Sequence, residues 1–313
     1  MSRGTFGLAV RRGAEAGTPP VPPGLVIGLA VLGVSWAAIL VRWSTVAPFP
    51  LAFWRLTLSL LVIAVGLTAT GGWGHFLRVR PADLALLALA GVLLAFHFAA
   101  WFASLDYTTV ASSTLFVDLH PLFAAGISAL WLRERPTRRE WSGIGVATAG
   151  ALVIGGVGLA LGPAAQKGNA LALFAGLLVA GYFVIGRRQR RWLGLWAYVA
   201  WVYVIAALVL LTVVWLRGEP LFAYPAREWL IFAGLAAGPM LLGHTGFNWA
   251  LRYVRAYIVN LAILAEPIGA SLLAWWLIGG EEVPGPATVA GGVLILAGLA
   301  ISVYSREERA RDS

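Results

Sequence analysis

The chain has 313 residues, of which 60% are hydrophobic and only 12% are charged, and its formal net charge is +9. A soluble domain usually has about 25% charged residues, so this composition excludes an ordinary soluble protein. The hydrophobic residues occur in runs of roughly 20, the length that a helix needs to cross a bilayer. We therefore expect an all-α polytopic membrane protein embedded in the lipid bilayer, and the sequence does not show the alternating strands of an outer-membrane barrel.

Ten apolar segments follow one another along the chain and are separated by short connections. Their approximate bounds are 25–43, 49–69, 83–106, 109–132, 141–161, 169–186, 193–216, 229–250, 256–279 and 285–304. Each segment is long enough to span a bilayer as a helix. We expect ten transmembrane helices, with cytoplasmic tails over residues 1–23 and 306–313.

Lysine and arginine residues are distributed unequally between alternate connections. If the N-terminus lies in the cytoplasm, 18 of them fall on the cytoplasmic side and 4 on the other, while Arg55 lies within a span. Short cytoplasmic loops carry an excess of these residues in membrane proteins. We therefore expect both termini in the cytoplasm and the protein in the cytoplasmic (inner) membrane. The positive charge then reports topology, and we expect no nucleic-acid partner.

The two halves of the chain resemble each other at an offset of 146 residues. The aligned residues are Leu105, Tyr107 and Pro121 with Leu251, Tyr253 and Pro267, and, after a shift of two, Pro136, Gly143 and Gly150 with Pro284, Gly291 and Gly298. Each half contains an odd number of spans, so the second must enter the membrane in the opposite orientation. We expect two inverted five-helix repeats, at 24–162 and 168–305, an arrangement typical of secondary transporters with a substrate site near the bilayer midplane.

The repeated stretches also resemble a known family. "ASLDYTTVASSTLFVDLHPLFAAGISALWLRERPTRREWSGIGVATAG" and "NWALRYVRAYIVNLAILAEPIGASLLAWWLIGGEEVPGPATVAGG" are similar to the repeated pattern of the EamA-type drug/metabolite transporters. The shared features are a small-Leu-x-Tyr turn, a proline within the span and a glycine-rich following span. The resemblance implies ten helices and export of amino acids or other small metabolites, and the chain looks most like the amino-acid exporters. One difference between the halves is His120, which corresponds to Glu266.

Four ionisable side chains are expected near the bilayer midplane, namely His97, Asp118, His120 and Glu266. Such groups are costly in a bilayer unless they face a cavity or a partner. Helix-breaking prolines, Pro121 and Pro267, follow the last two. We expect Glu266 to form a polar step in the wall of a substrate cavity. The alternative is that it only makes a hydrogen bond across a helix contact.

Further cavity candidates lie on neighbouring spans. Trp101 shares a helical face with His97, and Trp36 and Tyr182 could supply aromatic walls, although ordinary packing explains these two equally well. On a later span, His244 and Asn248 could line an inner vestibule or pack against the next span.

Arg55 lies about two turns into the second span. We favour a side chain that reaches back to the outer interface, as long basic side chains can. The alternatives are that it neutralises Asp118 or holds a substrate carboxylate. In the fifth span, a small-residue face recurs every four residues and should pack closely against another helix. It consists of Gly143, Ala147, Ala151 and Gly155.

The function that we favour is a secondary transporter that exports amino acids or similar small metabolites by alternating access and works as a monomer. The alternatives are an exchanger of nucleotide-sugars or phosphorylated metabolites, which would need more cavity cations, and a channel-like protein. The chain has no cysteine, and its four histidines lack the spacing of a metal site. We find no nucleotide-binding or nucleophile motif, so we expect no cofactor, no metal and no enzymatic activity.

Overall fold

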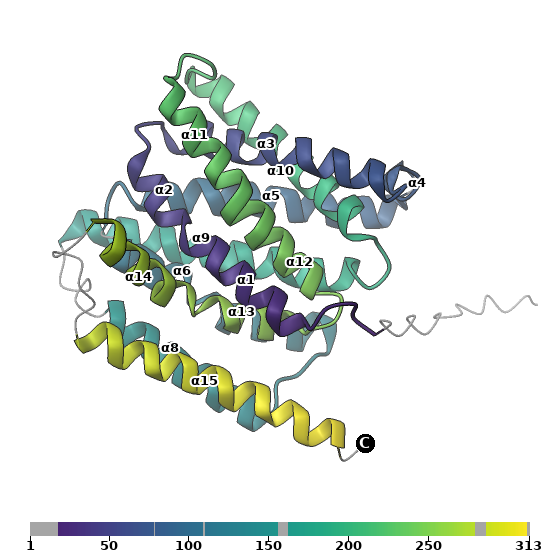
Figure 1. Ribbon diagram of the computed structural model, residues 1–313, viewed down its shortest axis with the longest axis vertical. Helices are drawn as coiled ribbons and strands as arrows, with labels where there is room; N and C mark the ends of the chain where they lie inside the picture. The colour runs from purple at the N-terminus through teal and green to yellow at the C-terminus, as the bar shows by residue number, and fades with distance from the viewer. Residues whose placement is uncertain (1–17, 78, 109, 156–161, 279–285, 312–313) are drawn as a thin grey trace, which may run out of the picture.

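The computed structural model describes residues 18–77, 79–108, 110–155, 162–278 and 286–311, and all regular structure within these ranges is helical (Figure 1). The expected all-α polytopic fold is therefore confirmed. Each of the ten predicted spans coincides with one helix or with a consecutive run of helices. Residues 109, 156–161, 279 and 285 at the ends of predicted spans, residues 1–17 and 312–313 of the predicted tails, and Pro284 of the repeat lie outside the described residues.

The first half of the chain runs from α1 to α8. Its elements are α1 (Pro23–Ser35), α2 (Ala37–Trp43), α3 (Pro48–Ala69), α4 (Trp73–Leu77), α5 (Pro81–Ser104), α6 (Val110–Val117), α7 (His120–Ile127), the π-helical η1 (Ser128–Leu132) and α8 (Arg138–Gly155). Several of the long helices begin with proline. A proline in the first helical turn removes a backbone donor that has no partner there, and it therefore fixes the start of a helix without loss.

The second half runs from α9 to α15. Its elements are α9 (Pro163–Gln189), α10 (Leu195–Arg217), α11 (Ala226–Leu235), the π-helical η3 (Ala236–Thr245), α12 (Gly246–Ala250), α13 (Ala256–Ile263), α14 (Glu266–Ile278) and α15 (Pro286–Arg311). The π-helical η3 contains Pro239, so the predicted span at 229–250 is a continuous helical run with a change of helical winding in its middle.

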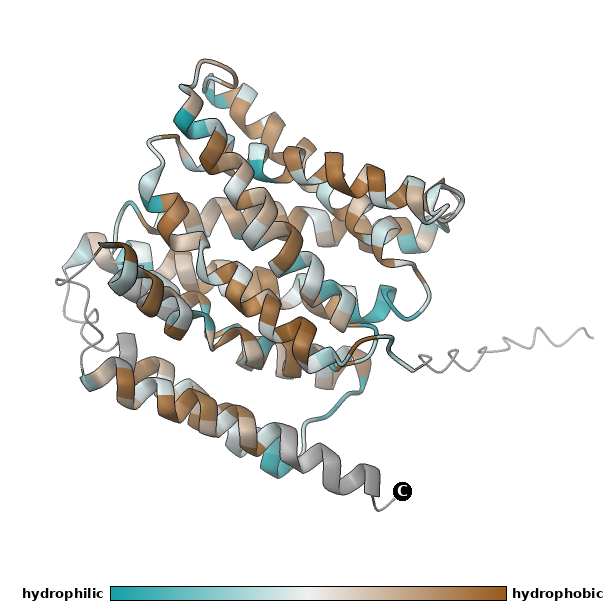
Figure 2. Ribbon diagram, viewed as in Figure 1, coloured by the Kyte–Doolittle hydropathy of each residue, from teal (hydrophilic) through white to brown (hydrophobic). Residues whose placement is uncertain are grey.

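Seven helical segments among the described residues are long and apolar enough to cross a membrane. They are Pro23–Trp43, Pro48–Ala69, Pro81–Ser104, Pro163–Gln189, Leu195–Arg217, Ala226–Ala250 and Ala256–Leu277. Shorter apolar helices cover His120–Leu132 and Val289–Ser302. Figure 2 shows hydrophobic colour along the helices, with most hydrophilic colour at helix ends and connections.

Two of the predicted spans are broken near their middle. The first break separates α6 from α7 at residues 118–119, and the second separates α13 from α14 at residues 264–265. These positions differ by the 146 residues of the sequence repeat, so the breaks are repeat-equivalent. Pro121 and Pro267 are the second residues of α7 and α14. The prolines therefore start a new helix after each break, where their missing N–H has no cost.

Helices α8 and α15, the last of each half, lie side by side (Figure 1). A Cβ atom added to Gly143 would lie 2.6 Å from the carbonyl oxygen of Gly298, and one added to Gly150 would lie 2.5 Å from that of Gly291. Because Gly143 is the repeat equivalent of Gly291, and Gly150 of Gly298, the contact is reciprocal, as a two-fold relation requires. The two helices therefore run antiparallel, which is the inverted arrangement expected from the sequence.

The small-residue face of α8 forms this contact as predicted. Ala147 and Ala151 are buried, and the backbone of Ala147 approaches Gly298. The surroundings of Gly155 lie outside the described residues. Small residues allow two helix backbones to approach closely, which is how helices associate in a membrane.

The other principal helix contacts also join one half to the other. Helix α5 packs against α9, α3 packs against α10, and α1 packs against η3. Helices α6 and α7 both contact α9, and α7 also contacts α13. The two halves therefore interlock, and the broken helices of both meet in the interior of the molecule.

Candidate substrate-binding cavity

A cavity lies between the two helix breaks. It is lined by Val34, Ala37, Arg55, His97, Phe98, Trp101, Val117, Asp118, His120, Val179, Phe183, His244, Phe247, Ile263 and Glu266. Its volume, counted as the space open to the centres of water molecules, is about 40 Å³. That space holds only a few waters, so the cavity must widen to admit a metabolite. Both halves of the chain contribute to its wall.

Arg55 of α3 is the permanent cation of this cavity, and its side chain is almost fully buried, with 1% exposed. The predicted reach to the outer interface is therefore wrong. The guanidinium lies over the ring of Phe98 on α5, 4.2 Å from the ring centroid. This cation–π contact turns the side chain into the protein and replaces part of its lost hydration. Its Nε and Nη1 atoms are buried without a hydrogen-bond partner among the described residues.

Two carboxyl groups lie at the helix breaks and line the same cavity. Asp118 lies in the first break, and Glu266 begins α14 after the second. Asp118 Oδ1 is 3.9 Å from Nε2 of His120, and its Oδ2 is buried without a partner among the described residues. Glu266 interacts electrostatically with both Arg55 and Asp118. The structure thus places His120 beside Asp118, and both line the same cavity as Glu266, the repeat equivalent of His120.

Three histidines and a tryptophan form part of the wall. The rings of His97 and Trp101 are nearly parallel, with centroids 6.5 Å apart, which confirms that they share one face of α5. His97 Nδ1 lies 3.0 Å from the carbonyl oxygen of Ala175. A carbonyl only accepts, so Nδ1 donates, and Nε2 is free to interact with the cavity. The indole N–H of Trp101 is buried without a partner among the described residues.

His244 of η3 belongs to the same cavity and does not form a separate vestibule. Its ring stacks on Phe183 at 5.9 Å between centroids and meets the ring of Phe98 edge-on at 5.2 Å. Its centroid lies 6.1 Å from that of His97. The cavity therefore has a wall of aromatic rings with polar edges, which suits both apolar and cationic groups.

Three other candidates lie outside the cavity lining. Tyr182 and Asn248 are buried behind His244, where the Asn248 amide donates hydrogen bonds to the Tyr182 hydroxyl and, at 2.7 Å, to the His244 carbonyl oxygen. Trp36 lies at the junction of α1 and α2 and is partly exposed. The packing interpretation therefore holds for Tyr182, Asn248 supports the wall from outside, and Trp36 lies outside the lining residues.

Sequence analysis did not single out the phenylalanines of the wall, which are Phe98, Phe183 and Phe247. Phenylalanine is frequent in every membrane helix, so its presence carries no signal by itself. Spacing gives a partial signal, because Phe247 is three residues after His244 and lies on the same helical face.

The polar groups of the cavity are not duplicated by the repeat. At the offset of 146 residues, Arg55 corresponds to Trp201, His97 to Gly243, Asp118 to Leu264, and His120 to Glu266. The scaffold is therefore two-fold symmetric while the charge distribution is not. A cavity of this kind presents a cation on one wall and carboxyl groups on others, and it can orient a ligand that carries both signs of charge.

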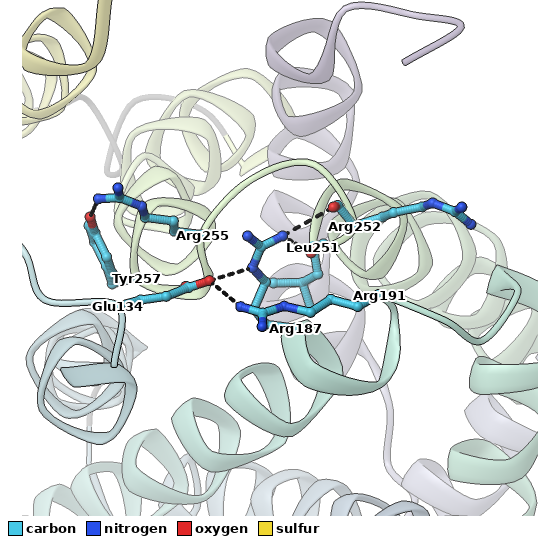
Figure 3. Close-up of polar contacts among 7 residues, drawn as sticks. All are labelled: Glu134, Arg187, Arg191, Leu251, Arg252, Arg255 and Tyr257. Carbon is cyan, nitrogen blue, oxygen red and sulfur yellow. Dashed lines mark hydrogen bonds and ion pairs between the residues drawn. The ribbon is translucent and has the colours of Figure 1, made fainter. Parts of the chain in front are cut away.

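A cluster of ion pairs joins the two halves at one end of the molecule (Figure 3). Glu134, between η1 and α8, accepts hydrogen bonds from Arg187 Nε at 3.0 Å and from Arg191 Nη2 at 2.7 Å. Arg187 also donates from Nη1 to the carbonyl oxygens of Leu251 at 2.8 Å and Arg252 at 3.1 Å. We call these five residues the Glu134 cluster. It connects the end of the fourth predicted span with those of the sixth and eighth.

A second set of contacts lies at the same end. Glu140 Oε1 accepts hydrogen bonds from Tyr257 at 2.8 Å and from Arg255 at 3.3 Å. Burial alone would lower the pKa of Arg255, but its hydrogen bond to Tyr257 and the charges of Glu140 and Glu134 raise it above the ordinary value. Arg255 therefore stays charged at every physiological pH, and this connection between the halves persists.

The family profile described as "EamA-like transporter family" matches the chain twice, over residues 24–156 and 166–304. A probable terminal-alkyne amino-acid exporter of Streptantibioticus cattleyicolor is 27% identical, over 88% of this chain and 91% of that protein. The pseudopaline exporter CntI of Pseudomonas aeruginosa is 29% identical, over 71% of this chain and 78% of that protein. A solved crystal structure has the same fold, with a TM-score of 0.74 and 23% identity, over 91% of this chain and 98% of that one. The chain therefore belongs to the EamA-like transporter family, and it moves small molecules across a membrane.

Proposed function

We propose that the protein is a secondary carrier that exports amino acids or similar small metabolites by alternating access. The observation that carries this proposal is the cavity at two repeat-equivalent helix breaks, with a cation, two carboxyl groups and aromatic rings in its wall. Amino acids carry both signs of charge on a small body, and they match this set of groups. Two relatives are named as a probable terminal-alkyne amino-acid exporter and a pseudopaline exporter, and these names agree with the proposal.

Alternating access requires that one end of the cavity be closed while the other can open. The Glu134 cluster supplies contacts that tie the two halves together at one end. The excess of basic residues at this end supports our proposal that it faces the cytoplasm, with both termini on the same side, and that the protein lies in the cytoplasmic membrane. We propose a monomer as the functional unit. An inverted repeat, whose halves are related by a two-fold axis, allows the two ends of the cavity to open and close in turn.

The exchange of nucleotide-sugars or phosphorylated metabolites is less well supported. Such substrates carry several negative charges, and known phosphate sites use clusters of arginine or lysine. Arg55 is the sole arginine or lysine among the lining residues of the described cavity. Two carboxyl groups beside it would repel a polyphosphate. A channel remains the second alternative, and the kinetics of transport distinguish it from a carrier.

Uptake assays with purified protein in liposomes and a panel of radiolabelled amino acids test this proposal. We expect saturable uptake of neutral or singly charged amino acids, and acceleration of uptake by unlabelled substrate on the opposite side. Nucleotide-sugars should neither enter nor compete. Uptake of nucleotide-sugars without uptake of any amino acid would refute the assigned substrate class, and flux that rises linearly without saturation would favour a channel.

A further inference from the structure

The guanidinium of Arg55 is buried but incompletely bonded. Its residue has 1% of its surface exposed, and its Nε and Nη1 atoms have no hydrogen-bond partner in the part of the chain that the structure describes. A guanidinium has five N–H donors in one plane. Leaving buried donors of a charged group unpaired costs more than leaving those of a neutral group. A buried guanidinium of this kind is stable only if other groups of the protein compensate for its lost hydration, or if a ligand accepts hydrogen bonds from its unpaired N–H groups.

The protein compensates for the charge only in part. The ring of Phe98, 4.2 Å from the guanidinium carbon, covers one face of the group. No ion pair within 4.0 Å joins Arg55 to a carboxylate among the described residues, although Glu266 interacts with it electrostatically over a longer distance. The ring offers no oxygen or nitrogen acceptor, so it leaves Nε and Nη1 without a hydrogen bond. The N–H groups of a guanidinium can bind a carboxylate with two parallel hydrogen bonds.

We propose that Arg55 binds the α-carboxylate of the substrate and thereby restricts the carrier to molecules with a free carboxylate. This inference rests on the proposed function. Asp118 and Glu266 then lie near the ammonium group, because both line the same cavity as Arg55 and a cation between them offsets the repulsion of their like charges. The substrate class is an α-amino acid with both groups unmodified. Carboxamides and decarboxylated amines lack the group that Arg55 needs.

Phe98 is a positioning residue in this arrangement. It lies on α5, whereas Arg55 lies on α3, so the contact between the two sets the direction of the guanidinium across a helix interface. The same ring meets His244 edge-on at 5.2 Å. Phe98 is thus also in contact with η3, and it holds the guanidinium of Arg55 in the cavity wall.

The test uses the purified full-length chain and three compounds that differ only at the carboxylate. L-Phenylalanine, its carboxamide and phenethylamine form one series, and L-leucine, its carboxamide and isoamylamine form a second. We expect wild-type protein to bind each amino acid roughly 10- to 100-fold more tightly than its carboxamide, since the carboxamide loses charge-assisted hydrogen bonds. Arg55→Gln should abolish this preference by weakening amino-acid binding, with carboxamide binding changed by less than about threefold. Arg55→Lys keeps the charge but loses the planar arrangement of N–H donors. Its preference for the amino acid over the carboxamide should therefore lie between those of the wild-type protein and Arg55→Gln.

Arg217→Gln is the matched control, because Arg217 is exposed and pairs with Glu219 away from the cavity. It should leave the preference for the amino acid unchanged. If wild-type protein transports amino acids but Arg55→Gln weakens amino acid and carboxamide equally, the carboxylate anchor is wrong and the proposed function stands. If no amino acid is bound but benzoate or isovalerate binds in an Arg55-dependent way, the anchor stands and amino-acid export is wrong. Should both Arg55 variants fail to fold, the wild-type series decides, and equal binding of amino acid and carboxamide would overturn the inference.

Discussion

Glu266 occupies the first position of α14, directly after a helix break. The exposed N–H groups and the dipole at the start of a helix favour a negative charge there. Its backbone carbonyl accepts a hydrogen bond from the hydroxyl of Ser35 at 3.4 Å, which connects the break to α1. The carboxylate lines the cavity, and it has no ion-pair partner within 4.0 Å among the described residues. The break therefore places this carboxylate at the start of a helix in the cavity wall, whereas an unbroken helix would place it in a helix interior.

Replacing the carboxylate tests its role in transport directly. We expect Glu266→Gln to lower transport per folded molecule at least about tenfold, because a neutral amide cannot balance an ammonium group. The melting temperature should stay nearly unchanged, since the amide has almost the same volume. Initial rates in liposomes, normalised to folded protein by size-exclusion chromatography, measure this.

The control for this change is Asp83→Asn, at the start of α5 and outside the cavity, which should transport normally. His120→Ala should also lower the rate, because its ring contacts Asp118. Wild-type rates for both Glu266→Gln and His120→Ala would remove these two residues from the mechanism.

Sequence analysis could place in the cavity those residues whose polar side chains are unusual within an apolar segment. His97, Asp118 and Glu266 stand out because a charge or imidazole within a span needs a reason to be there. Arg55 was misplaced, because its depth along a helix does not say whether a long side chain points to the lipid headgroups or to the interior. That direction depends on Phe98, which comes from another helix. Their roles in binding remain predictions.

At the scale of the elements, the helices and their order follow directly from the sequence. The length of each apolar segment predicts a span, and prolines mark the starts of α3, α5 and α9. The π-helical stretches η1 and η3 could not be predicted, because local winding depends on how neighbouring helices pack. The breaks were suggested by Pro121 and Pro267, although the prolines begin the second helix in each case and do not kink a continuous one.

Two glycines of α8 provide a matched test of the contact with α15. We expect Gly150→Ala to destabilise the protein by roughly 1–3 kcal/mol, because the new methyl group would lie 2.5 Å from the carbonyl oxygen of Gly291. Gly145, on the exposed face of the same helix, has no atom within 4 Å of an added Cβ. Gly145→Ala should be neutral or slightly stabilising, as alanine favours helix over glycine. Thermal unfolding in detergent compares the two, and equal effects would contradict the close contact.

The Glu134 cluster predicts a conformational effect. We expect Glu134→Gln to weaken the contacts that close this end of the cavity. The fraction of molecules that are open at this end should rise roughly three- to tenfold, a modest change because the ion pairs are partly exposed. A cysteine introduced by Val179→Cys in the cavity wall would report this through its rate of modification by an impermeant thiol reagent in inside-out vesicles. Glu219→Gln is the matched control, because that residue pairs with Arg217 within one half. A modification rate that does not change would show that the cluster does not hold this end shut.

At the scale of the whole molecule, the orientation in the membrane is a prediction from charge. Because the chain has no cysteine, single cysteines can be introduced without background. We expect Ala47→Cys and Ala164→Cys, both at exposed positions, to react with an impermeant reagent added to intact cells. Pro136→Cys and Trp192→Cys should react only after the membrane is opened. Reaction of Pro136→Cys in sealed cells would reverse the orientation.

The interlocked packing of the two halves also affects how the protein is made. Translation releases α1, α3 and α5 into the membrane before η3, α10 and α9, which are their packing partners, have been synthesised. The early helices must therefore stay in lipid with their later contact faces uncovered, and α1, which ends at residue 35, must wait longest because η3 begins at residue 236. Arg55 passes through this stage with Phe98 beside it but without Glu266 and the other second-half residues of the cavity wall. A ribosome that stops after residue 162 would leave five inserted helices without a partner, and membrane proteases that recognise unassembled helices should remove them.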